Sequence, residues 1–279
     1  MSDWLTQEQE AALRRLPSTL IEVAFPRSVE LRLHLAVRSV PRVLRASNCA
    51  VAATQLQEAG NVCLMLLVPG TNQLDLIGDY NRLLRWYPDV PVVAVFDRVS
   101  SSSAALLELG RNGVCEVVEC GELEVVSTVV NSLRRCHAIG VSERIWKVCI
   151  SCVPESLAAL LRRALQLAHE PLTVALLAKE MKIPGATLRM RCASAALPAP
   201  KWLVSWARVT TAAYFIETYH CSIEDAASAL EFPNALRVKD LCSEVLGRGA
   251  RIAQPRVSDC VDALRASLRK CDFRACQLV

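Results

Sequence analysis

Short apolar runs alternate with amphipathic helical patterns from Thr19 to His137, and this alternation limits the possible folds more than any other feature of the sequence. A strand–helix alternation predicts a parallel sheet that is covered by helices on both faces. The predicted strands are Thr19–Ala24, Arg42–Ala46, Val62–Val68, Val92–Phe96 and Cys115–Glu119. The predicted helices are Val29–Val40, Ala50–Ala59, Leu74–Arg85, Ser101–Asn112 and Leu123–Arg135.

The turns between these elements carry a second pattern. Pro26 follows the first strand, Pro69-Gly70 follows the third, and Pro88, Asp89 and Pro91 precede the fourth. Ser100-Ser-Ser-Ser supplies capping residues for the helix after the fourth strand. In element order, lengths and turns, about 120 residues resemble the receiver domain of bacterial response regulators. The resemblance implies a flavodoxin-like, five-stranded parallel sheet with flanking helices.

The residues that carry out phosphotransfer in receivers are replaced here. A phosphorylated receiver needs an acidic pair after the first strand to hold Mg²⁺, an aspartate on the third strand and a lysine after the fifth. The matching positions hold Ala24 and Phe25, Met65 (or Leu66), Phe96 at the hydroxyl position, and Glu119-Cys120. We therefore expect a pseudo-receiver that is a scaffold for dimerisation or for an unidentified signal. The alternative is a purely structural domain that only packs and pairs with another protomer.

A helix–turn–helix pattern follows a predicted helix at Ser156–His169. Thr173 is a suitable N-cap, and the spacing of the apolar residues that follow it predicts one buried helical stripe. That stripe consists of Val174, Leu177, Ala178 and Met181. Lys182-Ile-Pro-Gly breaks this helix, and a second short helix at Ala186–Ala195 is expected to bury Leu188, Cys192 and Ala195. Two short helices joined by a tight turn form a helix–turn–helix unit.

The same pattern recurs after a long predicted helix from Pro200 to about Thr218. Ser222 caps a helix whose inward residues are Ile223, Ala226, Ala227 and Leu230. Phe232-Pro-Asn forms the turn, and Ala235–Leu246 is the second recognition helix. Its inward residues are Val238, Leu241, Cys242 and Val245.

This repeated unit resembles the DNA-binding domain of the AraC family. The matching positions are Pro200-Lys-Trp-Leu-Val, Arg208-Val-Thr-Thr-Ala, Ser222-Ile-Glu-Asp-Ala-Ala through Phe232, and Gly247. The resemblance implies that two recognition helices enter successive major grooves on one face of double-stranded DNA. The candidate DNA-binding residues are Thr187, Arg189, Met190, Arg191, Ser194, Arg237 and Lys239. The arginines suit guanine or phosphate, and Met190 suits a thymine methyl group.

Four positions depart from the family pattern. Pro184 replaces a capping serine, Leu197 and Glu231 replace glycines, and Asp240 replaces an arginine. An acid on the DNA-facing side of the second recognition helix opposes phosphate binding. The second helix–turn–helix unit is therefore expected to serve for positioning or packing more than for reading bases, or to have lost contact with DNA altogether.

The distribution of charge favours the second half as the nucleic-acid partner. Residues 1–145 hold 14 Arg/Lys against 16 Asp/Glu, and residues 146–279 hold 18 against 12. The expected organisation is an α/β domain followed by an all-α domain. Its parts are a helical extension at 1–18, the pseudo-receiver at 19–138, a linker at 139–155, the double helix–turn–helix at 156–250 and a helical tail at 251–279. The tail helix is expected at Ser258–Lys270.

Several other functions lack support in the sequence. The apolar runs are too short to span a bilayer, and the polar, acidic start differs from a secretory signal, so we expect a cytoplasmic protein that is not bound to a membrane. The 13 cysteines are scattered through apolar segments as small hydrophobic residues. Only Cys149 and Cys152 have a ligand-like spacing, and no second pair accompanies them. We expect no metal, no cofactor and no enzymatic activity.

The sequence leaves two functions open. The first is a DNA-binding transcriptional regulator that forms a homodimer through its receiver-like domain. The second is an interaction adaptor of the same fold that has lost specific DNA binding, which Asp240 and the modest net charge favour.

Overall fold

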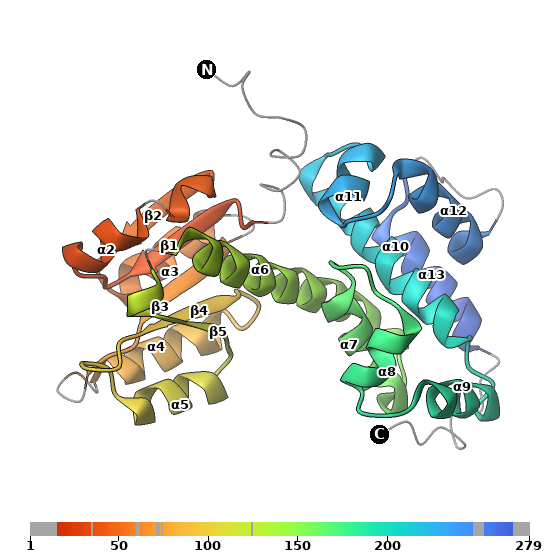
Figure 1. Ribbon diagram of the computed structural model, residues 1–279, viewed down its shortest axis with the longest axis horizontal. Coiled ribbons are helices and arrows are strands. Elements are labelled where there is room, and N and C mark those ends of the chain that lie inside the picture. Colours follow the sequence, from red (N-terminus) through yellow and green to blue (C-terminus); the bar gives the residue numbers. More distant parts are fainter. Residues whose placement is uncertain are drawn as a thin grey trace. The chain divides into compact units, whose positions relative to one another are not determined.

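The computed structural model describes residues 16–269, except 35, 60–61, 71–72, 74, 124 and 248–253. Most of the helical extension expected at 1–18, and the last ten residues of the expected tail, lie outside this range. The chain divides after Gly140 into two compact units (Figure 1). None of the helices in the described part combines the length and apolarity that crossing a membrane requires.

The first unit contains a five-stranded sheet whose pairings are all parallel. Its strands are β1 (Thr19–Val23), β2 (Arg42–Ala46), β3 (Val62–Leu67), β4 (Val92–Phe96) and β5 (Val114–Glu119). Their order in the sheet is β2-β1-β3-β4-β5, and Thr19 pairs with both Arg42 and Val62. This is the order of flavodoxin-like folds. The unit is therefore receiver-like, as the pattern of strands and turns predicted.

Helices cover both faces of the sheet and enclose a separate core on each side. Helices α3 (Cys49–Glu58), α4 (Asp75–Trp86) and α5 (Ser103–Arg111) pack on the face that presents Ile21, Leu64 and Ala94. Helix α2 (Arg27–Leu33), a 3₁₀ turn (Ala36–Ser39) and helix α6 (Val126–Cys149) pack on the face that presents Leu20, Met65 and Val95. The central strands are buried on both sides, which explains their nearly continuous apolar sequences.

Side-chain caps set the start of two helices. Asn48 Oδ1 accepts a hydrogen bond from the Val51 amide at 3.0 Å and begins α3. Ser102 Oγ accepts one from the Ala105 amide at 3.3 Å and begins α5, so the serine run caps this helix as predicted. Another 3₁₀ turn, Cys120–Glu122, follows β5.

Helix α6 is longer than the sequence indicated. It was expected to end near Arg135, but it continues to Cys149 and is followed by a 3₁₀ turn at Ile150–Cys152. Much of the segment expected to be a linker at 139–155 is therefore helical. Val129, Leu133 and Cys136 belong to the core of the first unit, whereas Ile145 and Cys149 belong to the core of the second.

The second unit consists of helices around one continuous core. They are α7 (Glu155–Leu167), α8 (Val174–Glu180), α9 (Gly185–Ser194), α10 (Pro200–Tyr219), α11 (Ile223–Ala229), α12 (Ala235–Leu246) and α13 (Val257–Leu268). Helix α10 is buried along much of its length and contacts all the others in this group (Figure 1). The tail helix α13 packs against α10 and α12 as part of this core.

Candidate nucleic-acid interface

Helices α8 and α9 form the first helix–turn–helix unit around a tight turn. Thr173 Oγ1 accepts a hydrogen bond from the Leu176 amide at 3.1 Å and begins α8. After this helix, Lys182 has a φ of 56°, and the Ile183 amide donates to the Ala178 carbonyl at 3.0 Å. A residue in the left-handed conformation, followed by a backbone hydrogen bond that spans five residues, ends one helix and redirects the chain into the next.

Helices α11 and α12 repeat that geometry. Ser222 Oγ accepts from the Asp225 amide at 3.1 Å, and Asp225 Oδ2 accepts from the Ser222 amide at 3.1 Å. Glu231 has a φ of 55°, and the Phe232 amide donates to the Ala227 carbonyl at 2.9 Å. The repeat seen in the sequence is thus also a structural repeat, with Glu231 in the place of Lys182.

Glu231 occupies a left-handed conformation, which favours glycine. We expect Glu231→Gly to raise the free energy of unfolding by about 1 kcal/mol, because the left-handed region is strained for residues with a Cβ atom. Urea denaturation measures this change. Glu231→Ala is the control, since alanine keeps the Cβ atom; equal stability of the two variants would contradict the assignment. At the other glycine position, the residue with positive φ is Ala196 (51°), one residue before Leu197.

Arg208 of α10 contacts the loop before the first helix–turn–helix unit and the turn of the second. It is buried (6% exposed), and its Nη1 donates to the carbonyls of Ala168, at 3.3 Å, and Glu170. Its guanidinium lies 3.8 Å from the centre of the Phe232 ring, in the turn of the second unit. The sequence identified Arg208 and Phe232 as family positions but did not reveal that they contact each other.

Helix α9 presents the predicted contact residues on its outer side. Arg189, Met190 and Ser194 are exposed, with Met190 exposed to 62%, while Thr187 and Arg191 are half-buried. Leu188, Cys192 and Ala195 are buried, as the helical spacing predicted. The structure therefore brings the five predicted residues of the first unit together on one short helix.

Helix α12 buries its predicted inner residues but presents a different outer surface. Val238, Leu241, Cys242 and Val245 are buried, and Arg237 is exposed. Lys239 Nζ lies 3.7 Å from Glu224 Oε1 on α11. An ion pair within the unit reduces the positive charge that Lys239 can offer to a phosphate.

The two units carry opposite charge. Residues 173–197 contain four basic side chains and one acid, Glu180, which forms an ion pair with Arg163 of α7. This pairing lowers the pKa of Glu180. The basic residues are Lys179, Lys182, Arg189 and Arg191. Residues 222–247 contain two basic side chains, Arg237 and Lys239, against five acids. Those acids are Glu224, Asp225, Glu231, Asp240 and Glu244. The charge of the first helix–turn–helix unit is complementary to a polyanion, and that of the second helix–turn–helix unit is not.

Lys182 is a basic residue that was not among the predicted contacts. The sequence pattern indicates only that it belongs to the break between α8 and α9, but its exposed side chain lies in the turn directly before the recognition helix. Its charge and its place in the turn are both visible in the sequence. They could have indicated a phosphate contact.

The carboxyl ends of β3 and β4, in the receiver-like unit, lie under a hydrogen-bonded loop. The Asp97 carboxylate accepts from Ser100 Oγ at 2.6 Å and from the Val99 amide at 3.1 Å, and these bonds lower the pKa of Asp97. Ser101 Oγ donates to the Val68 carbonyl at 2.8 Å. The loop approaches Gly70 so closely that a Cβ atom there would lie 2.7 Å from the Ser100 carbonyl oxygen.

The positions that correspond to receiver phosphotransfer residues lie nearby. Met65 is fully buried within β3, Ala24 has a φ of 57° after β1, and Glu119 Oε2 forms an ion pair with Arg98 at 2.8 Å. In the described part of the chain, no group of three or more His, Cys, Asp or Glu residues is arranged to hold a metal ion. Asp97 and Glu119 at this edge have partners within the protein.

The cysteines in the described ranges are all free thiols. Burial raises the pKa of Cys149 to about 12, and the Cys152 thiol donates to the Cys149 carbonyl at 3.0 Å. Burial also raises the pKa of Cys242 to about 11. Thiols with raised pKa values are poor nucleophiles and poor metal ligands, which agrees with their use as small core residues.

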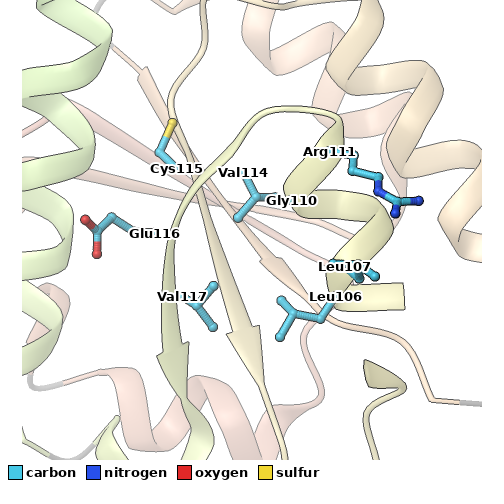
Figure 2. Close-up of a pocket in the computed structure, with 8 residues that line it drawn as sticks. All are labelled: Leu106, Leu107, Gly110, Arg111, Val114, Cys115, Glu116 and Val117. Carbon is cyan, nitrogen blue, oxygen red and sulfur yellow. The ribbon is translucent and has the colours of Figure 1, made fainter. Parts of the chain in front are cut away.

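Helix α5 and the edge strand β5 form a second candidate site. Side chains from both elements line a cavity of about 460 Å³ (Figure 2). Leu107 and Val117, which belong to this lining, are 61% and 48% exposed. Glu116, which also belongs to the lining, pairs with Arg135 of α6 at 2.8 Å. The sheet therefore ends in an open, largely apolar edge.

Fold and site together describe a flavodoxin-like, receiver-like unit followed by a helical unit with two helix–turn–helix repeats. No protein-family model matches the sequence, and no curated protein matches it. Among solved structures, FixJ from B. japonicum matches with 13% identity and a TM-score of 0.34, covering 80% of this chain and 95% of FixJ. The response regulator StyR matches with 14% identity and a TM-score of 0.33, covering 81% of this chain and 98% of StyR.

Proposed function

We propose that this protein is a sequence-specific, DNA-binding transcriptional regulator of the AraC type, with DNA contacts concentrated in its first helix–turn–helix unit. The basic outer side of α9 is the observation that carries the proposal. Arg189 and Met190 are exposed there, next to the half-buried Arg191. Arginine pairs with guanine edges and phosphates, and a methionine side chain can pack on a thymine methyl group. This function requires no catalytic residue, metal or cofactor.

The second unit has a supporting role in this proposal. Its recognition helix carries Asp240 and Glu244, and Lys239 is paired with Glu224. Carboxylates that face a duplex repel its phosphates. The second unit therefore positions the first through the shared helix α10 and adds little affinity of its own.

Recovery of bound DNA tests the proposed function. The purified full-length protein is incubated with sheared genomic DNA, and the bound fragments are sequenced. We expect a shared motif among the fragments, because direct readout by α9 discriminates between bases. Fragments without a common motif would contradict a sequence-specific regulator.

The acidic second unit favours an alternative function, an adaptor of the same fold that binds proteins and not DNA. Five acids against two basic residues in 222–247 are the observation that favours it. This alternative predicts that the fragments recovered with the wild-type protein share no motif, while the protein still binds a protein partner.

The receiver-like unit is proposed to be a non-phosphorylatable homodimerisation domain. At its carboxyl edge, Asp97 accepts a hydrogen bond from Ser100 and Glu119 pairs with Arg98. The apolar edge formed by α5 and β5, with Leu107 and Val117 exposed, is the surface that we propose for pairing (Figure 2).

Charge at this edge should disrupt the dimer. We expect the double variant Leu107→Glu/Val117→Glu to be monomeric where the wild type is dimeric, since two carboxylates per protomer would have to be desolvated in the interface. Sedimentation velocity measures the change. Val99→Glu is the control, because Val99 is exposed in a loop outside this edge. A dimer that tolerates both glutamates would contradict this surface.

A further inference from the structure

A cavity lies against the recognition helix of the first unit. It has a volume of about 360 Å³ and is bounded by the start of α8, one side of α9 and the start of α10. Its apolar lining consists of Val174, Cys192, Ala193, Leu197, Ala199 and Pro200. Cys192, Leu197 and Pro200 are buried and form its inner wall, while Ala193 and Ala199 are exposed at the opening.

Two cations complete the lining. Arg189 reaches the cavity from α9, and Lys201 reaches it from the first turn of α10. Both side chains are exposed, and none of the eight lining residues is acidic. An apolar surface with positive charge at its edge is complementary to a molecule that has an apolar body and one negative group.

We infer that this cavity binds a small organic anion, an aromatic or aliphatic carboxylate with roughly a dozen non-hydrogen atoms. The apolar body lies against Leu197 and Pro200, and the carboxylate accepts hydrogen bonds from Arg189 and Lys201. A cavity of this volume is at the small end of the range for ligand sites. The small volume of the cavity therefore excludes large cofactors and nucleotides as ligands.

The location of the cavity gives the ligand a regulatory effect, which rests on the proposed function. Arg189 is both a lining residue and a proposed base or phosphate contact. A carboxylate that engages this guanidinium competes with DNA for it. The bound anion therefore weakens DNA binding by the first unit.

Direct titration tests the site without DNA. Naphthalene-2-carboxylate is titrated into the full-length protein by calorimetry, with 2-naphthalenemethanol as the neutral probe of matched shape. We expect a Kd of roughly 0.1 to 1 mM for the carboxylate, in line with the affinity per atom of small ligands. The neutral probe is expected to bind at least about tenfold more weakly, because it lacks the charge-assisted hydrogen bonds. Equal affinity for the two probes would overturn the inference.

Two variants with matched controls locate the binding. Ala193→Leu fills the opening of the cavity and Lys201→Gln removes one cation, so each is expected to weaken carboxylate binding at least fivefold. Ala186→Leu changes an exposed alanine of α9 outside the cavity, and Lys179→Gln removes an exposed cation of α8 outside it. These controls are expected to bind as the wild type does. Unchanged binding in Ala193→Leu and Lys201→Gln would overturn the assignment of the site.

Competition separates the ligand site from the proposed function. At about twice its wild-type Kd, naphthalene-2-carboxylate is expected to weaken binding to a selected DNA fragment about threefold in the wild type and less than about 1.5-fold in Lys201→Gln, because the variant is occupied less. Ligand binding without any effect on DNA affinity would overturn the regulatory role. A protein that binds the carboxylate but no DNA would leave the cavity site standing and refute the transcriptional function.

Discussion

The double variant Arg189→Ala/Arg191→Ala is expected to bind a selected DNA fragment about 100-fold more weakly than the wild type, since each arginine contact to a base or phosphate contributes about 1–3 kcal/mol. Both side chains lie on α9, where Leu188 and Cys192 anchor the helix in the core. Their removal shortens two exposed or half-buried side chains and leaves that core unchanged. Fluorescence anisotropy at fixed salt concentration measures the loss of affinity.

The second unit supplies the matched comparison. Arg237→Ala/Lys239→Ala removes two basic residues from the corresponding helix α12, and we expect a loss of less than about threefold because Lys239 is already paired with Glu224 in an exposed ion pair. Circular dichroism should show both double variants folded. Equal losses from the two units would contradict the division of labour proposed here, and no loss from either would favour the adaptor.

Arg208→Ala is expected to lower the free energy of unfolding of the whole helical unit, α7 to α13, by about 3 kcal/mol. Two carbonyl acceptors lose their donor, and a buried cation–π contact is lost. The carbonyls are those of Ala168 and Glu170, and the ring is that of Phe232. Arg208 therefore connects α10 both to the loop before the first unit and to the turn of the second. Urea denaturation followed by tryptophan fluorescence measures the change, since Trp206 is buried two residues away on α10.

An exposed arginine provides the control for this variant. Arg265 of α13 pairs with Asp262 at 2.8 Å on the surface, so Arg265→Ala is expected to cost less than about 0.5 kcal/mol. A similar small loss for Arg208→Ala would show that its buried contacts do not stabilise the unit. Retained stability with lost DNA affinity would instead indicate a direct role for Arg208 at the interface.

The sequence was most informative where a single pattern governs an element. The predicted strands Arg42–Ala46 and Val92–Phe96, and the predicted helix Ala235–Leu246, have the bounds that the structure shows. Val92–Phe96 is a short apolar run between turn residues, Arg42–Ala46 lies between Pro41 and Ser47-Asn48, and α12 has a side-chain cap, Asn234, directly before it. Local signals of this kind act within a few residues, so they can be interpreted without knowledge of the fold.

Two helices differ from expectation. Helix α2 ends at Leu33 and a 3₁₀ turn at Ala36–Ser39 follows, whereas the prediction continued to Val40. Pro41 disfavours a helical conformation for Val40, which accounts for the end of the 3₁₀ turn but not for the end of α2. In α6, the residues buried in the first half and those buried in the second lie on different sides of the helix. No single apolar stripe runs along its length, and its second half was therefore interpreted as a linker.

The candidate site shows the same division between local and tertiary information. Helical spacing predicted that Leu188 and Cys192 face inward and that Arg189 and Met190 face outward. The contact of Arg208 with Phe232 joins residues 24 positions apart, and Lys239 meets Glu224 across two helices. Such pairs depend on how the helices pack, and periodicity within one helix contains no information about them.

The ratio between specific and non-specific affinity is the most direct measure of whether this protein reads DNA sequence through its first helix–turn–helix unit. It compares a recovered fragment with a scrambled duplex of equal length and composition, in one buffer, for the wild type and for Arg189→Ala/Arg191→Ala. We predict that the wild type prefers its fragment by about 1000-fold or more and that the variant loses most of this preference. Equal affinity of the wild type for both duplexes, with the same salt dependence, would contradict a sequence-specific regulator.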